Sequence, residues 1–305
     1  MILCCGEALI DMLPRETAAK EPAFAPHAGG AVFNTAIALG RLGAPAGYFG
    51  GLSTDLFGQL LEAGLTASQV DSRYAPRSVR PTTLAFVTLT DGQAQYTFHD
   101  ENTAGRMLSP ADLPMLDDDV KALFFGGISL VSEPAADSYA ALCTQASATH
   151  MVMVDPNIRP GFITDPAGYR ARLATMLAQA DIIKVSDEDL DWLGTTPEAL
   201  IDGGAALVLM TRGAQGVTGH GATGTLTVPA HKVQVVDTVG AGDTFNAGFL
   251  AGLHRAGLLN KGRLRAAPLK ALRPAIELGA AAAAVTVSRA GANPPWAAEL
   301  TTAEL

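Results

Sequence analysis

The sequence predicts an α/β fold in which a mostly parallel sheet is covered by helices on both faces. One observation behind this is the recurrence of short apolar runs, each followed by turn residues. A second is that amphipathic stretches of helical length lie between these runs, an alternation typical of parallel sheets. The third is a single interruption near residues 82–98, where two alternating strands replace the pattern. We therefore expect one large sheet with a small β structure added to it.

The expected elements follow one another in a regular order. The first half of the chain is expected to form a strand at residues 1–13, a helix at 34–42, a strand at 46–52 and a helix at 56–63. Later apolar runs predict strands at residues 122–125, 151–154, 182–185 and 206–210. Amphipathic stretches predict helices at residues 135–148, 169–180 and 187–194. Near the end we expect a strand at 233–236, helices at 244–253 and 279–284, and a turn at 285–291.

The interruption of the pattern has the form of a hairpin. Residues 82–89 and 93–98 alternate in character and flank Asp91-Gly92, which is a strong turn signal. An ordinary hairpin at the edge of the main sheet is the alternative to a separate structure. No Ser/Gly linker, internal repeat or low-complexity block divides the chain. Residues 1–305 are therefore predicted to form a single domain that carries the hairpin as an insertion.

Composition and charge narrow the function classes. The 305 residues include 48% apolar and 17% charged residues, which suffices for a sizeable core. The chain has 21 Lys and Arg against 30 Asp and Glu, a formal net charge of −9. Nucleic acids and anionic membrane surfaces attract basic patches, so we expect neither as a partner.

The cysteines and the apolar segments indicate a cytoplasmic protein. Cys4, Cys5 and Cys143 suggest neither a disulfide framework nor a zinc spacing, and small buried thiols in a reducing compartment explain them better. The N-terminus has no basic leader, and Glu7 interrupts its apolar run early, which argues against a signal peptide. Apolar stretches such as residues 280–287 are too short to span a bilayer.

The most informative segment is Gly240-Ala241-Gly242-Asp243, which lies between an expected strand and an expected helix. The free amides and positive end of a helix favour an anion, and small residues let a phosphate approach the backbone. A carboxylate there would repel that anion. This conflict is resolved if Asp243 is a general base that accepts the proton of an alcohol, while the amides hold the phosphoryl group that the alcohol attacks.

This segment has other interpretations. The three residues 240–242 could form only a tight turn, with Asp243 as an ordinary helix cap. The chain contains no G-x-x-x-x-G-K-[ST] string, which excludes a P-loop. A dinucleotide fingerprint also fails, because Phe245 occupies the position of the third glycine.

Several motifs resemble those of the ribokinase (PfkB) family of sugar kinases. The segment DTVGAGDTFNAGFLAGL is similar to the C-terminal signature of the family, and residues 29–36 with 39–43 are similar to its first signature. Further family-like stretches, in the family's order, lie at residues 6–11, 155–159 and 211–216. The resemblance therefore runs through nearly the whole chain. It implies a ribokinase-like three-layer α/β/α sandwich with a small β-sheet lid, formed by about residues 13–28 and 82–103. Lids of this family can pair between subunits, which makes a homodimer an expectation.

The resemblance also assigns a sugar site. Hydroxyl-rich ligands are held by carboxylates and amides, while their rings stack on apolar faces. The family's sugar positions fall on Asp11 and Asn34, with a backbone contact at Gly30; for Asp11 and Asn34, a turn or cap role is the alternative. Segments 96–104 and 155–160 resemble bacterial fructokinases more than ribokinases. They add Tyr96, Phe98 and Arg159, whose guanidinium could bridge the sugar and the transferred phosphoryl group. His99 is not expected to belong to the catalytic set, because a lone histidine is more often incidental.

The nucleotide and metal positions also come from the resemblance. Residues proposed to contact ATP are Lys184, Ser186, Thr211, Arg212, Gly213, Gly216, Gly240 and Gly242. The acidic position that organises Mg²⁺ through water falls on Asp189, where the family usually has Glu. Many members bind a monovalent cation, and by position a K⁺ site would comprise Asp237, Val239, Thr286, Arg289 and Gly291.

The implied reaction is in-line transfer of the γ-phosphoryl group of ATP to the 6-hydroxyl of D-fructose, with Mg²⁺ bridging the nucleotide oxygens. Asp243 would accept the proton, and the amides of residues 241–243 would stabilise the moving charge. A 2-keto-3-deoxygluconate kinase, a ribokinase and a nucleoside kinase are the alternatives within the family. Residues 96–100 contain no Arg for a sugar acid, and Asp100 and Glu101 would repel one. An inactive sugar-binding regulator is the alternative from another class, and a nucleotide-dependent oxidoreductase is disfavoured by the failed glycine spacing.

Overall fold

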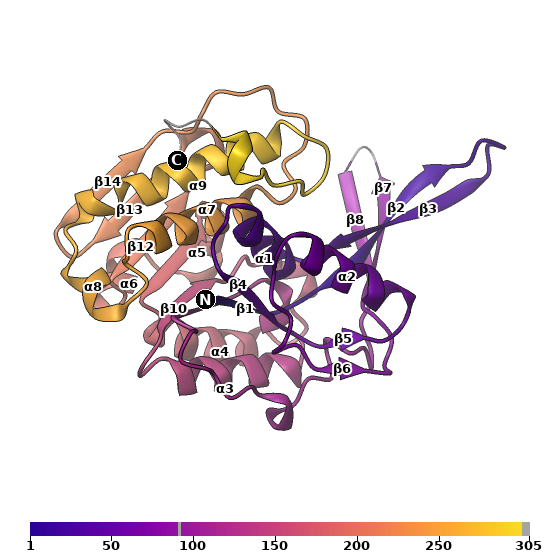
Figure 1. Ribbon diagram of the computed structural model, residues 1–305, viewed down its shortest axis with the longest axis horizontal. Helices are drawn as coiled ribbons and strands as arrows, with labels where there is room; N and C mark the ends of the chain where they lie inside the picture. Colours follow the sequence, from indigo (N-terminus) through magenta and orange to yellow (C-terminus); the bar gives the residue numbers. More distant parts are fainter. Residues whose placement is uncertain (91–92, 301–305) are drawn as a thin grey trace.

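The computed structural model describes residues 1–90 and 93–300, and its largest feature is a mixed sheet with the strand order β14-β13-β12-β11-β10-β9-β1-β4 (Figure 1). The parallel strands of this sheet are β1 (Ile2–Cys5), β4 (Ala46–Phe49), β9 (Ala122–Gly126), β10 (Met151–Asp155), β11 (Ile182–Ser186) and β12 (Leu207–Thr211). Two antiparallel strands, β13 (Val217–Gly221) and β14 (Gly224–Val228), extend one edge.

Helices cover both faces of this sheet, as its continuous apolar strands require. In β1, Ile2 and Cys4 face one buried cluster while Leu3 and Cys5 face another. The first cluster is covered by α1 (Ala31–Arg41), α2 (Leu56–Ala67), α7 (Ala241–Arg255), α8 (Lys261–Ala266) and α9 (Arg273–Val287). The second is covered by α3 (Ala135–Ala146), α4 (Pro166–Gln179), α5 (Asp187–Leu193) and α6 (Pro197–Asp202). The predicted three-layer α/β/α fold is confirmed.

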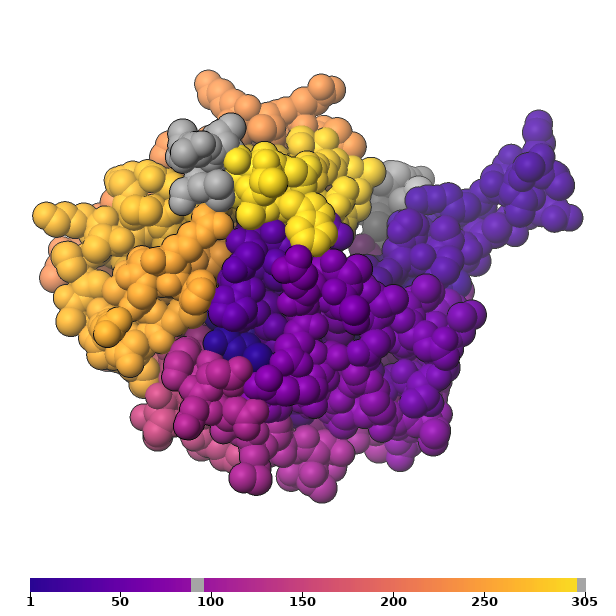
Figure 2. All heavy atoms as spheres, viewed as in Figure 1, coloured from indigo at the N-terminus to yellow at the C-terminus, as the bar shows by residue number. Residues whose placement is uncertain are grey.

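A second sheet stands apart from the main one. It has the order β3-β2-β7-β8 and consists of β2 (Leu9–Glu16), β3 (Pro22–Gly29), β7 (Leu84–Thr90) and β8 (Gln93–His99). Figure 2 shows the β2–β3 ribbon projecting away from the body of the molecule. A further pair, β5 (Leu52–Ser53) and β6 (Arg77–Ser78), is parallel. The turn expected at Asp91-Gly92 lies outside the described residues.

Three predicted strands are wrong in extent or existence. Residues 1–13 form two strands, because β1 ends in the main sheet at Cys5 and the chain then enters the second sheet as β2. Residues 46–52 divide at Gly50-Gly51, between β4 and β5. Residues 233–236 form no strand. Their side chains are exposed, 61% in the case of Val235. The Val236 amide donates a hydrogen bond to the Val287 carbonyl at 2.8 Å, which is not part of a β ladder. An apolar run with no neighbouring strand has no partner for the hydrogen bonds of a sheet, so it does not form a strand despite its β propensity.

Helix α7 is held rigidly against α9 by small residues. A Cβ atom on Gly248 would lie 2.7 Å from the Cα atom of Gly279, so the two backbones meet at closer range than any larger residue would allow. Every residue of α7 from Asp243 to Leu253 is buried. Within residues 1–90 and 93–300, no helix is long and apolar enough to cross a membrane.

Candidate active site

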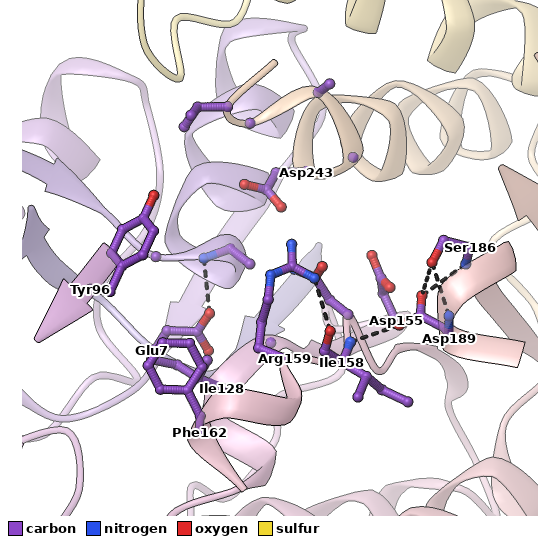
Figure 3. A pocket seen from close by; sticks show the side chains of 18 of the residues that line it. Glu7, Tyr96, Ile128, Asp155, Ile158, Arg159, Phe162, Ser186, Asp189 and Asp243 are labelled. Atoms are coloured by element: carbon purple, nitrogen blue, oxygen red, sulfur yellow. Dashed lines mark hydrogen bonds between the residues drawn. The ribbon is translucent and has the colours of Figure 1, made fainter. Parts of the chain in front are cut away.

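A cavity of about 850 Å³ opens between the carboxyl ends of the parallel strands, the second sheet and the start of α7. Ligands of open α/β sheets commonly bind at this edge. The predicted site residues that line it are Asp11, Gly30, Tyr96, Phe98, Arg159, Lys184, Ser186, Asp189, Val239, Gly240, Ala241, Gly242 and Asp243. These residues come from both halves of the chain, so the fold brings the two signature segments together. Figure 3 shows the cavity with Asp243 above Arg159.

The tip of α7 forms one wall of the cavity. The helix begins at Ala241, three residues earlier than predicted, so Asp243 belongs to its first turn. Gly240 is the N-cap residue with φ of 76°, a left-handed conformation that favours glycine. The first amides of a helix have no acceptor within it. The Ala241 amide donates to the Thr238 carbonyl at 3.3 Å, contrary to the expectation for residues 241–243, so the donors that this tip offers to an anion are the amides of Gly242 and Asp243. The interpretation of Asp243 as a simple cap does not fit, since no side-chain cap bond is made at this terminus.

Asp243 is a buried carboxylate with an unusual proton affinity. Burial raises its pKa to about 7, and the nearby carboxylates of Asp155 and Glu7 add to this effect. Asn34 opposes it, because its Nδ2 atom donates a hydrogen bond of 2.9 Å to the Asp243 Oδ2 atom, and the ammonium of Lys184 also lowers the pKa. A group with a pKa near 7 can both accept and release a proton at neutral pH, as a general base must.

Polar and aromatic side chains of the second sheet form the side of the cavity away from α5. Asp11 lies on β2, and burial raises its pKa to about 6. Tyr96 and Phe98 lie on one face of β8, with their ring centroids 6.1 Å apart. His99 lies on the opposite face of β8, against Phe86, and does not line the cavity. Arg159, at the floor, directs its guanidinium toward Asp243 (Figure 3). These groups suit a hydroxylated ring with one hydroxyl near Asp243.

A buried ion pair lies beneath the tip of α7. The Lys184 Nζ atom is 3.1 Å from the Asp155 Oδ2 atom, which also accepts a hydrogen bond of 2.7 Å from the Asn246 Nδ2 atom. Burial alone would lower the pKa of Lys184, but the carboxylates of Asp155 and Asp189 outweigh it and raise the pKa. A Cβ atom on Gly242 would be 3.4 Å from Nζ, so a fixed positive charge borders the backbone donors of α7.

The start of α5 supplies acidic groups at the other side of the cavity. Ser186 caps this helix, and the Asp189 Oδ2 atom accepts hydrogen bonds from the Ser186 amide at 2.8 Å and its hydroxyl at 2.9 Å. The Asp189 Oδ1 atom accepts one from the Ile158 amide at 2.7 Å. Both oxygens of Asp189 are therefore engaged in holding the site together. Glu188 also lines the cavity and is exposed there.

The other proposed nucleotide residues lie outside this cavity, at the end of β12. The Thr211 hydroxyl donates to the Val185 carbonyl at 3.3 Å, and the Arg212 Nη2 atom donates to the Thr218 hydroxyl at 2.9 Å. Gly213 and Gly216 follow with φ of 49° and 88°. This segment is one strand away from Ser186, with which Thr211 pairs in the sheet.

The residues expected to hold a monovalent cation gather beyond α7. The Asp237 carboxylate accepts hydrogen bonds from the amides of Val239 at 3.0 Å and Gly291 at 2.8 Å. The Thr286 carbonyl accepts one from the Arg289 amide at 3.0 Å. Among the described residues, no group of three or more His, Cys, Asp or Glu side chains could hold a metal ion. A cation here would rely on one carboxylate and backbone carbonyls, which are suitable ligands for K⁺.

Sequence reasoning missed several residues that line the cavity, namely Glu7, Asp155, Asn157, Phe162 and Glu188. Glu7 fixes the start of α1, because its Oε1 atom accepts a hydrogen bond from the Ala31 amide at 2.8 Å and its Oε2 atom one from the Ser129 amide at 3.2 Å. A signal was present, since a charged residue interrupts an apolar strand at Glu7 and another ends one at Asp155. Asn157 has a φ of 43°, which no sequence pattern indicated.

Comparisons with known proteins identify relatives of this chain. The sequence model of the family described as pfkB family carbohydrate kinase matches residues 1–299 of this chain. The chain is 53% identical over 281 residues to a fructokinase of Rhizobium leguminosarum bv. trifolii, covering 90% of this chain and 86% of that protein. A fructokinase from Xylella fastidiosa with bound ATP superposes with a TM-score of 0.82 at 31% identity, covering 95% of this chain and 93% of that one. A Vibrio cholerae O395 fructokinase double mutant with bound fructose, ADP and potassium ion gives a TM-score of 0.81 at 27% identity, with coverages of 95% and 93%. The chain therefore belongs to the pfkB family of carbohydrate kinases.

Proposed function

We propose that this protein is a fructokinase that transfers the γ-phosphoryl group of ATP to the 6-hydroxyl of D-fructose. The observation that carries the proposal is the position of Asp243, a buried carboxylate with a pKa of about 7 at the tip of a helix whose free amides face the same cavity. A proton acceptor and anion donors at one point are what phosphoryl transfer to an alcohol needs. The relatives named fructokinase support fructose as the acceptor.

One side of the cavity binds the sugar and the other binds the phosphates of ATP. The sugar ring lies against Asp11, Tyr96 and Phe98, with its reacting hydroxyl at Asp243. The phosphates of ATP lie toward Lys184 and the start of α5. Arg159 lies between the two sides (Figure 3) and neutralises charge on the phosphoryl group as it moves. The second sheet covers the sugar as a lid and excludes water, which suppresses hydrolysis of ATP.

Metal ions complete the proposed site. Glu188 presents an exposed carboxylate where a water-coordinated Mg²⁺ on the nucleotide would sit, and hard oxygen ligands are those that Mg²⁺ prefers. Asp189, whose two oxygens already accept hydrogen bonds, would act on the ion only through its water shell. When bound, Mg²⁺ supplies positive charge to the phosphate oxygens. A K⁺ ion would be held near Asp237 by its carboxylate and by nearby carbonyls, behind the tip of α7. The potassium ion in the Vibrio cholerae structure supports this assignment.

The test is release of ADP, measured by a coupled assay with fructose, ribose, 2-keto-3-deoxygluconate and adenosine as acceptors. We expect the highest kcat/KM with fructose, since Asp11 faces the sugar side and would repel the carboxylate of a sugar acid. Turnover of the keto acid alone would refute fructose as the substrate. Tight sugar binding without any ADP release would indicate an inactive sugar-binding regulator.

We further propose a cytoplasmic homodimer that pairs through the lid. Cys4, Cys5 and Cys143 are free and buried, as suits a reducing compartment. Phe24 on β3 is 45% exposed on the face of the lid away from the cavity, so the lid offers apolar surface to a second copy. Light scattering at several protein concentrations tests the dimer, and a Phe24→Ser substitution should weaken it.

A further inference from the structure

A second cavity, of about 370 Å³, lies directly beside the proposed sugar site. Three side chains, Phe98, Ile128 and Phe162, line both cavities and therefore separate them. Phe98 comes from β8 of the lid, and Phe162 follows Arg159 by three residues on the body of the protein. Their rings meet edge to face, with centroids 4.4 Å apart and planes at 78°. Phe98, Ile128 and Phe162 are called the wall below.

The wall lies opposite the reacting group. Figure 3 shows Phe162 and Ile128 across the cavity from Asp243, to one side of Arg159. In the furanose form of fructose, the carbon that bears the 6-hydroxyl and the C1 hydroxymethyl group leave the ring on opposite sides of its oxygen. If the 6-hydroxyl lies at Asp243, the C1 end points toward the wall. The acceptor can then be lengthened at C1 only as far as the wall permits.

The space behind the wall is polar, and the two cations that line it within the described part of the chain, Arg106 and Arg172, are both engaged. The Arg172 Nη2 atom lies 2.5 Å from Glu133 and 2.8 Å from Asp137, and its Nη1 atom donates to the Leu130 carbonyl at 3.1 Å. Arg106 is likewise engaged, by donating to the Glu133 carbonyl at 3.1 Å. An anionic extension of the sugar would find no available partner among these cations.

The rest of the lining combines the acidic residues Asp100, Glu101 and Asp165, which disfavour an anion, with neutral hydrogen-bonding residues. Ser132 and Thr164 bring hydroxyls to this cavity. Tyr169 also lines it, and the buried hydroxyl of this side chain has no hydrogen-bond partner within the part of the chain that the structure describes. These groups suit a neutral, oxygen-bearing extension of a sugar.

We propose that the wall sets the length limit of the acceptor at C1, and that opening it lets the second cavity receive a neutral substituent on that end. This inference rests on the proposed phosphorylation of fructose at C6. A rigid apolar wall rejects an added methyl or ethyl group because its rings cannot both keep their contact and make room. One added carbon in such a pocket is worth about 10–200-fold in specificity.

The test compares D-fructose with 1-O-methyl-D-fructose and 1-O-ethyl-D-fructose in the ADP-release assay. The wild-type protein is expected to prefer fructose by about tenfold or more in kcat/KM. Phe162→Ala should reduce that preference about tenfold, mainly through a lower KM for the ethers, because the reacting end is unchanged. Phe98→Ala opens the wall from the lid side and should act in the same direction.

Phe86→Ala is the matched control. Phe86 lies on the other face of the lid, packs against Phe24 with centroids 5.1 Å apart, and lines neither cavity. The control should leave the preference unchanged, which separates opening of the wall from general loosening of the lid. If the wild-type protein phosphorylates fructose and both wall variants keep the wild-type preference for fructose over the ethers, this inference is overturned and the proposed function stands. Failure of the wild-type protein to phosphorylate fructose would overturn the proposed function as well.

Discussion

Replacing Asp243 by Asn is expected to remove most of the turnover and to make the folded protein more stable at pH values above about 4. The Asp243 carboxyl is 8% exposed, and burial raises its pKa to about 7 from an ordinary value of 3.8. Between these two pH values the folded state holds a proton that the unfolded state has released, so the free energy of unfolding falls as the pH rises. Relative to low pH, ionisation of Asp243 lowers the free energy of unfolding by about 4 kcal/mol at pH 8, and by nothing below about pH 4.

Asparagine keeps the size of the side chain and can still accept the hydrogen bond from Asn34, but it carries no charge. The variant should therefore match the wild-type stability near pH 4, exceed it by about 1.5 kcal/mol at pH 5, and exceed it by about 4 kcal/mol at pH 8. Urea unfolding at these pH values measures the difference. Asp118→Asn, at an exposed position, is the matched control and should stay within about 0.5 kcal/mol throughout.

The same ionisation should appear in the kinetics. Only the unprotonated carboxylate accepts a proton, so kcat/KM of the wild-type protein should decline below about pH 7. Turnover of Asp243→Asn should fall at least ~10²-fold, the low end for a positioned base. The reasoning is refuted by near-normal turnover in this variant, or by a stability difference that is the same at pH 5 and pH 8.

Three further predictions concern the surroundings of this helix tip. Asn34→Ala removes the 2.9 Å hydrogen bond to Asp243 and should move the acid limb of the kcat/KM profile upward by about one pH unit; an unmoved limb would count against the bond. Lys184→Met removes the charge beside the anion site and should lower kcat ~10²-fold with little change in the KM for the sugar, as steady-state kinetics would reveal. Gly248→Ala forces a Cβ atom to 2.7 Å from Gly279 and should cost about 1–3 kcal/mol in thermal unfolding, whereas an unchanged Tm would show that the two helices can separate.

The features that the sequence predicted correctly are those set by local pattern. Apolar runs of strand length separated by amphipathic stretches were sufficient for the parallel sheet and its two helical layers. The strand predicted at residues 233–236 failed because strand formation depends on a neighbour, which the local sequence does not reveal. The break of the first strand was missed for a related reason, since Glu7 turns inward to hold a helix 24 residues away.

The site was predictable only in part. Asp243 and the glycines beside it stand out because they are adjacent in the sequence. The glycines indicate an anion-binding helix terminus, and a carboxylate at the same place would repel the anion. Their partners come from far away along the chain: Asn34 is 209 residues from Asp243, and Asp155 is 91 residues from Asn246. A single sequence gives no distance between such residues. The buried network that sets the proton affinity of Asp243 therefore became visible only in the fold.

The placement of chemistry and recognition on different parts of the fold has a consequence for specificity. Asp243 lies on a helix that is buried from its first turn and packed tightly on α9 through Gly248 and Gly279, so the core fixes the position of the proposed general base. The wall belongs in part to the lid, whose β8 is anchored to the body through the contact of Phe98 with Phe162. Substitutions in the wall can therefore change which sugars fit without moving the base or the amides, whereas substitutions along α7 affect stability and chemistry together. Variation of the acceptor should arise more readily at the wall than at any position on α7.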